Sequence, residues 1–250
     1  KLQQNLFFKN KLAMKRKSRL LILLALALTS SMVLKAQSVN PSASYTDASG
    51  EQQTIAPGDS YSGSAPLQVH FQADATPEDY TGYYEWRFYL EGQQDKPYLI
   101  RYEQETDYTF TSAGSHRVQL YAKFTKGNDI VEFGEEDISP FAISISESKL
   151  EFPNAFSPNG DGINDIYKAK SGYQSIVEFD AYIFNRWGVK LYEWHDPAGG
   201  WDGKYKGKDV AQGVYYCLVK AKGADGRIFN FKKDVNLLRG YTESSSSVTQ

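Results

Sequence analysis

The sequence predicts an all-β chain that folds into two consecutive antiparallel β-sandwich domains. The chain of 250 residues contains 18 tyrosines, and aromatic residues make up 14% of it, which favours strands. Short segments of alternating apolar and polar residues recur between glycine and proline turns, a spacing typical of sandwiches. No amphipathic helix longer than two turns can be recognised after residue 36.

The first 36 residues resemble a targeting segment. A basic cluster from Lys15 to Arg19 precedes an apolar run from Leu20 to Leu28, and the small residue Ala36 closes the segment. This order predicts a secretory signal peptide that is cleaved after Ala36. A membrane anchor would need about 20 apolar residues in a row, whereas Ser30, Ser31 and Lys35 interrupt this segment too early. Residues 1–13 are expected to be an upstream extension.

Residues 37–147 are predicted to form the first domain. Residues 37–60 are rich in small and polar residues and are expected to be a linker or a loosely attached first strand. Four strands and a final apolar segment follow, with turn residues from Ser112 to Gly114. The expected inward positions are Leu67, Val69, Phe71, Tyr84, Trp86, Phe88, Tyr98, Ile100, Tyr102, Val118, Leu120, Ala122, Phe124, Phe141, Ile143 and Ile145.

Residues 148–242 are predicted to form the second domain, and residues 243–250 a disordered tail. Strands are expected over residues 176–184, 189–193, 213–220 and 228–237. In the first of them, Val177, Phe179, Ala181 and Ile183 share one face. Asp225–Gly226 predicts a hairpin turn, because glycine readily adopts a positive φ.

Charge and cysteine content exclude several classes of function. Residues 37–150 hold 7 basic and 18 acidic residues, a net charge of −11, so nucleic acid is not expected as a partner. Cys217 is the single cysteine, so no intramolecular disulfide can form. Cys217 and the scattered His70, His116 and His195 do not suggest a thiol enzyme, and no common catalytic motif occurs. We therefore predict a protein that is not an enzyme and has no organic cofactor.

The segment from Asn159 to Asp165 allows two interpretations. Asn159, Asp161 and Asp165 could offer oxygen ligands to a calcium ion from one short flexible loop. The same residues could instead hold the loop through Asx turns, with glycines supplying the positive φ angles. A complete calcium loop with a terminal bidentate glutamate is absent from the sequence.

The second domain resembles a known family through four motifs in order. They are Phe152–Asp165, Phe184–Gly188, Gly200–Gly203 and Gly213–Tyr216. They resemble the gliding motility-associated C-terminal domain, or type B sorting domain, of the type IX secretion system of Bacteroidetes. The resemblance implies an Ig-like sandwich that the outer-membrane translocon and its shuttle barrel recognise. It also implies export by the Sec route to the periplasm and then delivery to the cell surface.

Two of these motifs are candidates for the recognition surface. Asn185, Arg186, Trp187 and Gly188 follow the central strand, and Trp201, Asp202 and Gly203 form the second group. A structural interpretation has Trp187 packing the sandwich edge, Asn185 capping the turn and Gly188 at positive φ. A functional interpretation has Arg186 facing a partner, because a guanidinium can pair in a bidentate manner.

The first domain is similar to PKD-type Ig-like domains. The resemblance is carried by Ala65–Phe71, Tyr84–Phe88 and Tyr108–Leu120, whereas Tyr89–Gly92 departs from the usual acidic turn. A single small passenger domain suggests a component or carrier of the secretion and surface-attachment machinery that contacts other envelope proteins. The alternative is a small adhesin or glycan-binding module for surface polysaccharide. Aromatic residues considered for stacking on sugars are Tyr83, Tyr84, Tyr89, Trp194 and Trp201.

Overall fold

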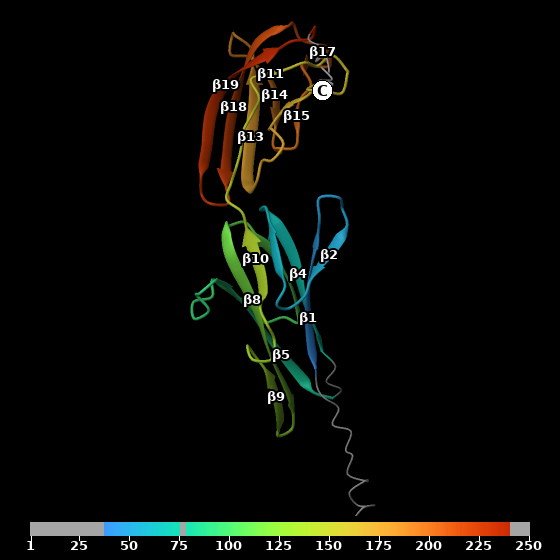
Figure 1. The fold of residues 1–250 in the computed structure, drawn as a ribbon, viewed down its shortest axis with the longest axis vertical. Helices are drawn as coiled ribbons and strands as arrows, with labels where there is room; N and C mark the ends of the chain where they lie inside the picture. The colour runs from blue at the N-terminus through green and yellow to red at the C-terminus, as the bar shows by residue number, and fades with distance from the viewer. Residues whose placement is uncertain (1–37, 76–78, 241–250) are drawn as a thin grey trace, which may run out of the picture. The chain divides into compact units, whose positions relative to one another are not determined.

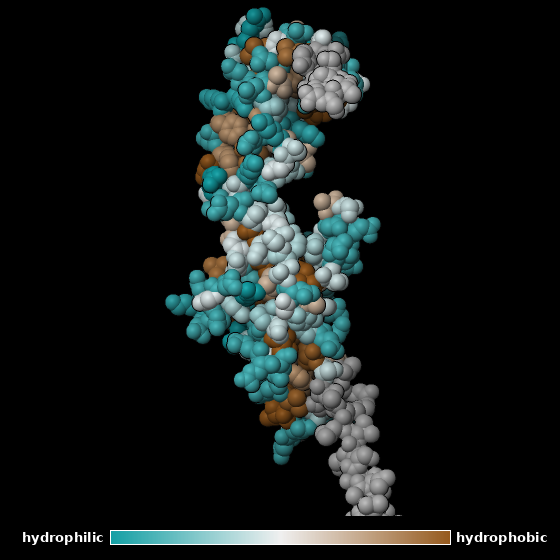
Figure 2. Space-filling view, viewed as in Figure 1, coloured by the Kyte–Doolittle hydropathy of each residue, from teal (hydrophilic) through white to brown (hydrophobic). Residues whose placement is uncertain are grey.

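The computed structural model describes residues 38–75 and 79–240. The predicted signal peptide and tail lie outside these residues. All regular elements in the described part of the chain are strands, as the sequence predicts (Figure 1). No described helix could cross a membrane. The visible face is mostly hydrophilic, with small hydrophobic areas between (Figure 2).

The first sandwich contains one four-stranded antiparallel sheet. Its strand order is β2-β1-β4-β7. The strands are β1 (Val39–Thr46), β2 (Gln52–Ile55), β4 (Leu67–Ala75) and β7 (Glu105–Phe110). The segment expected to be a linker therefore contains β1, which pairs with β4 from Val39 to Ser44 and buries Ala43. The sequence could not distinguish a linker from a strand here, because small residues show little alternation of apolar and polar side chains.

The second sheet of this sandwich has the order β3-β10-β8-β5-β6, and β9 also pairs with β8. Its strands are β3 (Ser60–Gly63), β5 (Thr81–Leu90), β6 (Leu99–Arg101), β8 (Gly114–Lys126), β9 (Asp129–Phe133) and β10 (Phe141–Ile145). The long pair β5–β8 aligns Trp86 with Leu120 and Phe88 with Val118. These four side chains are fully buried, so alternation correctly predicted the inward face.

Strand β6 differs from the prediction. Tyr98 and Tyr102 are exposed, whereas Leu99 packs against the core. Alternation alone could not decide which face of this strand is buried. One face carries Tyr98, Ile100 and Tyr102, the other carries Leu99 and Arg101, and both faces include apolar side chains. The three-residue pairing of β6 with β5 fixes the face.

The second sandwich is built around one five-stranded sheet of order β11-β19-β18-β13-β14. Its strands are β11 (Ala155–Phe156), β13 (Ile176–Phe184), β14 (Lys190–Trp194), β18 (Gly213–Gly223) and β19 (Ile228–Leu237). Two short pairs complete it: β12 (Tyr167–Lys168) with β15 (Gly200–Trp201), and β16 (Lys204–Tyr205) with β17 (Lys208–Asp209). The β18–β19 hairpin turns at Asp225–Gly226 as predicted, with Gly226 at φ 81°.

One inward position of β13 was predicted wrongly. Phe179, Ala181 and Ile183 are buried as expected, but Ile176 takes the inward place that the pattern gave to Val177. A β-bulge between Ile176 and Glu178 shifts the register there. A bulge adds one residue to the strand, so it reverses the faces on one side of itself.

Two separate hydrophobic clusters form the core. One draws its buried residues from Ala43 to Ile145, and the other from Leu150 to Leu237. The predicted domain boundary at residues 147 and 148 falls in the gap between these two sets and stays a prediction. Each cluster contains large, fully buried aromatic side chains, among them Phe71 and Trp86 in the first and Tyr167 and Trp201 in the second.

Candidate functional site

The turn after β13 is closed by Asn185. Its side-chain oxygen accepts hydrogen bonds from the backbone N–H groups of Trp187 and Val189, both at 3.0 Å. Gly188 has φ 78° and donates its N–H to the carbonyl of Asn185 at 3.0 Å. Asn185 and Gly188 therefore have the structural roles that the sequence suggested for them.

Trp187 does not pack against the edge of the sandwich. Its side chain is 72% exposed, and the guanidinium carbon of Arg186 lies 4.3 Å from the centroid of its ring. The Asn185 bonds fix the backbone so that residue 187 projects from the tip of the turn. The structural interpretation of Trp187 was thus wrong, and Arg186 and Trp187 form one exposed pair.

In the segment from Gly200 to Gly203 the tryptophan is buried, unlike the exposed Trp187. Trp201 is fully buried, and its indole N–H donates to the carbonyl of Lys204 at 2.8 Å. A Cβ on Gly200 would lie 2.5 Å from the carbonyl oxygen of Tyr167, so only glycine allows β15 to pair with β12. Trp201 cannot contact a partner of the folded domain, contrary to its assignment to the recognition surface.

The remaining members of this group shape the turn that follows. Asp202 accepts a hydrogen bond from the N–H of Lys204 at 3.0 Å. Gly203 has φ 77°, and Arg239 donates to its carbonyl at 2.7 Å. These contacts give Asp202 and Gly203 structural roles.

Arg239 is a structural residue that sequence reasoning missed. Besides the carbonyl of Gly203, its guanidinium reaches the carbonyl of Pro158 at 3.0 Å and that of Val210 at 3.4 Å. It thereby ties the end of β19 to three loops. A single cation beyond the last strand gives no sequence signal for this role.

The loop from Asn159 to Asp165 is held by its own backbone. The carboxylate of Asp165 accepts the N–H groups of Gly160 and Gly162 at 2.7 and 2.8 Å. These two bonds lower the pKa of Asp165. Asp161 accepts the N–H of Ile163 at 2.8 Å.

The side chain of Asn159 completes this arrangement. Its amide donates to Asp161 at 2.8 Å, and its oxygen accepts the N–H of Asp161 at 3.0 Å. Among the described residues, no group of three or more acidic, histidine or cysteine side chains is placed to hold a metal ion. The geometry fits the Asx-turn interpretation, and calcium binding stays a prediction.

The thiol and imidazole groups are not brought together. Cys217 is buried on β18 in the core of the second sandwich, and burial raises the pKa of its thiol to about 12. His116 belongs to the first sandwich, where it donates to or accepts from Tyr98 at 3.0 Å. His195 lies 2.6 Å from Asp180 on the surface. That the chain is not an enzyme stays a prediction.

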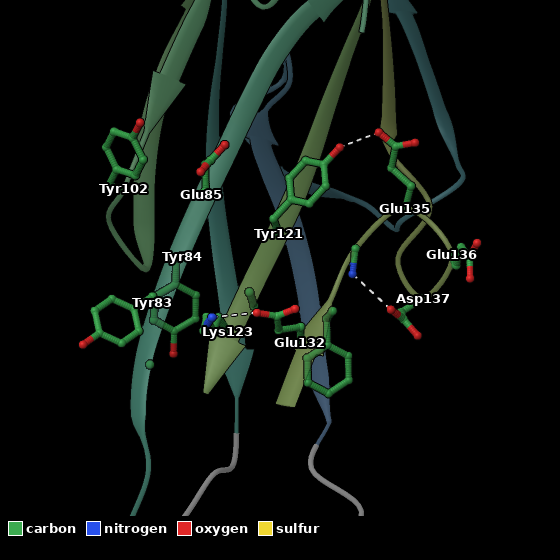
Figure 3. Close-up of a pocket in the computed structure, with 14 residues that line it drawn as sticks. Tyr83, Tyr84, Glu85, Tyr102, Tyr121, Lys123, Glu132, Glu135, Glu136 and Asp137 are labelled. Atoms are coloured by element: carbon green, nitrogen blue, oxygen red, sulfur yellow. Dashed lines mark hydrogen bonds and ion pairs between the residues drawn. The ribbon is translucent and has the colours of Figure 1, made fainter. Parts of the chain in front are cut away.

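The outward face of the β5–β8–β9 part of the first sandwich forms a groove of about 710 Å³. Because Tyr84 and Trp86 point inward, their neighbours Tyr83 and Glu85 point outward. Tyr83 is 59% exposed and Tyr102, just after β6, is 68% exposed. Figure 3 shows these two rings on one side of the groove and a loop of acidic residues on the other.

Most aromatic residues that the sequence suggested for stacking on sugars are not available. Tyr89, Trp194 and Trp201 are buried, and Tyr84 packs against the core. Tyr83 is exposed as the hypothesis requires. Tyr102 was missed, because the sequence placed it on the inward face of its strand.

The second sandwich matches a described family. Residues 150–232 match the CHU_C type IX secretion signal domain. The match covers the segment that carries the four sequence motifs, and it marks the chain as one sorted by the type IX secretion system. It therefore implies contact with that machinery and export to the cell surface or beyond. No curated protein matches the chain.

Solved structures with similar architecture are distant. A mixed-linkage glucan utilization locus protein of Bacteroides ovatus, SGBP-B, solved with a mixed-linkage heptasaccharide, is 14% identical, with a TM-score of 0.24. The alignment covers 72% of this chain and 43% of that one. Drosophila N-cadherin EC1-4 is 14% identical over 72% of this chain and 47% of that one, with a TM-score of 0.23. A tetra-tandem repeat from the extending region of a large adhesion protein is 11% identical, covering 82% of this chain and 68% of that one, with a TM-score of 0.25. At such TM-scores these likenesses carry no argument about ligands.

Proposed function

We propose that this chain is a non-enzymatic surface protein of a Bacteroidetes bacterium, and that the outer-membrane translocon and shuttle barrel read its second sandwich as an address. The match over residues 150–232 supports the address. The basic, apolar and small residues before Ala36 support prior delivery by the Sec route. The first sandwich is the passenger, and its strand motifs support a PKD-type Ig-like domain.

Within the second sandwich, the exposed pair Arg186–Trp187 is the best candidate for the surface that the sorting machinery recognises. A tryptophan that is 72% exposed gives up most of the free energy that its burial would contribute. The Asn185 bonds nevertheless hold the turn in the shape that presents it. Large aromatic residues and arginine are the side chains most often found at energetically important contacts. We infer that the sorting machinery contacts this pair.

The decisive experiment compares export of two variants in a type IX-competent host. Trp187→Ala should lower the surface fraction of the chain and leave it in the periplasm. Ile228→Ala is the matched control, because Ile228 is 67% exposed at the other end of the sheet, beside the β18–β19 turn. A chain that ends before residue 150 sets the level without sorting.

Thermal melting of both purified variants tests whether they are folded. Equal surface fractions for the parent and Trp187→Ala would contradict the role of the exposed pair. Surface delivery of the truncated chain would overturn the whole proposal. Arg186→Ala, with the tryptophan retained, then shows whether the cation contributes by itself.

The passenger allows two roles. The first is a carrier or component of the secretion and surface-attachment machinery, which co-purification with outer-membrane secretion proteins would support. The second is a small adhesin or glycan-binding module. The open groove beside Tyr83 and Tyr102 favours the second role, because exposed aromatic rings in a preformed concave surface suit a ligand.

A further inference from the structure

We propose that the groove on the first sandwich binds a neutral oligosaccharide. This inference rests on the second candidate role of the passenger and is independent of sorting by the second sandwich. The groove of about 710 Å³ lies within the usual range for small-ligand sites. Its floor is the outward face of β5, β8 and β9 (Figure 3).

Two exposed tyrosine rings lie on one side of the groove (Figure 3). Tyr83 lies on β5 and Tyr102 just after β6, and they are 59% and 68% exposed. A pyranose ring has an apolar C–H face and a rim of hydroxyl groups, so it stacks well on such a ring. A rigid tyrosine loses little conformational entropy when it makes this contact.

The charged groups on the floor are already paired. The amine of Lys123 lies 2.7 Å from Glu132, and the guanidinium of Arg87 bonds to Glu85. The Arg87 guanidinium also lies 4.3 Å from the centroid of the Tyr121 ring. A cationic guest would have to displace these internal cations, whereas hydroxyl groups can donate to the carboxylates and accept from the cations without breaking the pairs. The floor therefore favours a neutral polyhydroxylated ligand over a basic peptide.

The far wall of the groove is acidic and disfavours anionic polymers. It is formed by Glu135, Glu136 and Asp137. No basic residue on this wall offsets them, so a polyuronate would be repelled. The charge of the wall thus disfavours anionic ligands only. A cationic ligand is disfavoured by the paired floor alone, so hexalysine is one of the probes below.

The same wall is fixed before any ligand arrives. The hydroxyl of Tyr121 donates to Glu135, and the pKa of Tyr121 rises to about 12, chiefly through burial and then through this bond. The buried amide of Gln119 donates to the carbonyl of Ile138 at 2.8 Å. The N–H of Gly134 donates to Asp137 at 3.0 Å. A preformed wall reduces the entropy lost on binding.

Calorimetric titration of the full chain tests the inference with defined probes. The neutral probes are cellohexaose, laminarihexaose, mannohexaose and xylohexaose, and the charged probes are hexagalacturonate and hexalysine. We expect at least one neutral probe to bind about tenfold more tightly than either charged probe. Tyr83→Ala and Tyr102→Ala should each weaken that binding about tenfold or more.

Tyr173→Ala is the matched control, because Tyr173 is an exposed tyrosine of the second sandwich and should bind like the parent. Because both groove tyrosines are mostly exposed, we expect their variants to keep the melting temperature of the parent. Weaker binding could then not be attributed to unfolding. The inference is overturned if no neutral probe binds, if either groove variant binds like the parent, or if hexalysine or hexagalacturonate binds most tightly. Surface export of the groove variants reports separately on sorting, which should be unaffected.

Discussion

Two short segments of the second sandwich each combine a tryptophan with a glycine, and the fold uses them in opposite ways. Trp201 is fully buried, and Gly200 allows its strand to approach β12 closely. Trp187 is 72% exposed at the tip of a turn that Asn185 holds. A motif that resembles a recognition signal can therefore consist of residues that build the fold, and burial separates the two roles.

The largest expected effect tests this contrast directly. Trp201→Ala should lower the free energy of unfolding by about 3–5 kcal/mol, because it leaves a cavity in the core. Trp187→Ala should change it by less than about 0.5 kcal/mol. Denaturant unfolding of both variants measures the difference. Similar losses for the two would mean that the tryptophans do not have separate roles.

The glycines of the two segments sharpen the comparison. Gly200→Ala should be destabilising by more than about 2 kcal/mol, because the new Cβ would lie 2.5 Å from a backbone oxygen that cannot move aside. Gly188→Ala meets no atom within 4 Å and suffers only the strain of φ 78°, which costs about 1 kcal/mol. Melting curves of the pair give the order, and a reversed order would show that β12 and β15 are not tightly paired.

The cap of the exposed turn predicts a smaller change. Asn185→Ala removes the acceptor of two backbone N–H groups and should cost about 1 kcal/mol, since both groups lie at the surface and can bind water instead. Its effect on export should exceed its effect on stability, because the turn would no longer present Trp187 in one shape. Asn185→Asp keeps the acceptor and should restore both. Failure of this rescue would argue against a capping role.

The pH dependence of the loop from Asn159 to Asp165 is a further prediction. The N–H groups of Gly160 and Gly162 lower the pKa of Asp165 below its value in the unfolded chain. Such a carboxylate stabilises the fold above about pH 4 and loses this contribution as the pH falls through its folded pKa. Asp165→Asn should therefore melt earlier than the parent at neutral pH, with the gap closing in acid. Asp234→Asn, an exposed substitution on β19 that also removes one carboxylate, is the matched control for the change in net charge.

Calcium should have the smallest effect of all. The carboxylates of Asp161 and Asp165 already accept backbone N–H groups, so the loop is closed without an ion. We expect no shift in melting temperature between millimolar calcium and a chelator. A shift that Asp165→Asn abolishes would establish the calcium interpretation instead.

Several features followed from the sequence by itself. Alternation in β5 and β8 required Trp86 and Leu120 to share the buried face, because successive strand residues point to opposite sides. The Asp225–Gly226 pair required a hairpin turn. The four motifs of the second domain predicted the family that matches there.

Other features were decided by the tertiary structure, because they depend on contacts between distant segments. The bulge after Ile176 placed Ile176 rather than Val177 on the inward face. The pairing of β6 with β5 left Tyr102 exposed in the same groove as Tyr83. Whether a tryptophan is buried or exposed depends on which strand covers it, and a local motif carries no such information. The sequence therefore determined which residues alternate and turn, while packing decided which of them remain available to a partner.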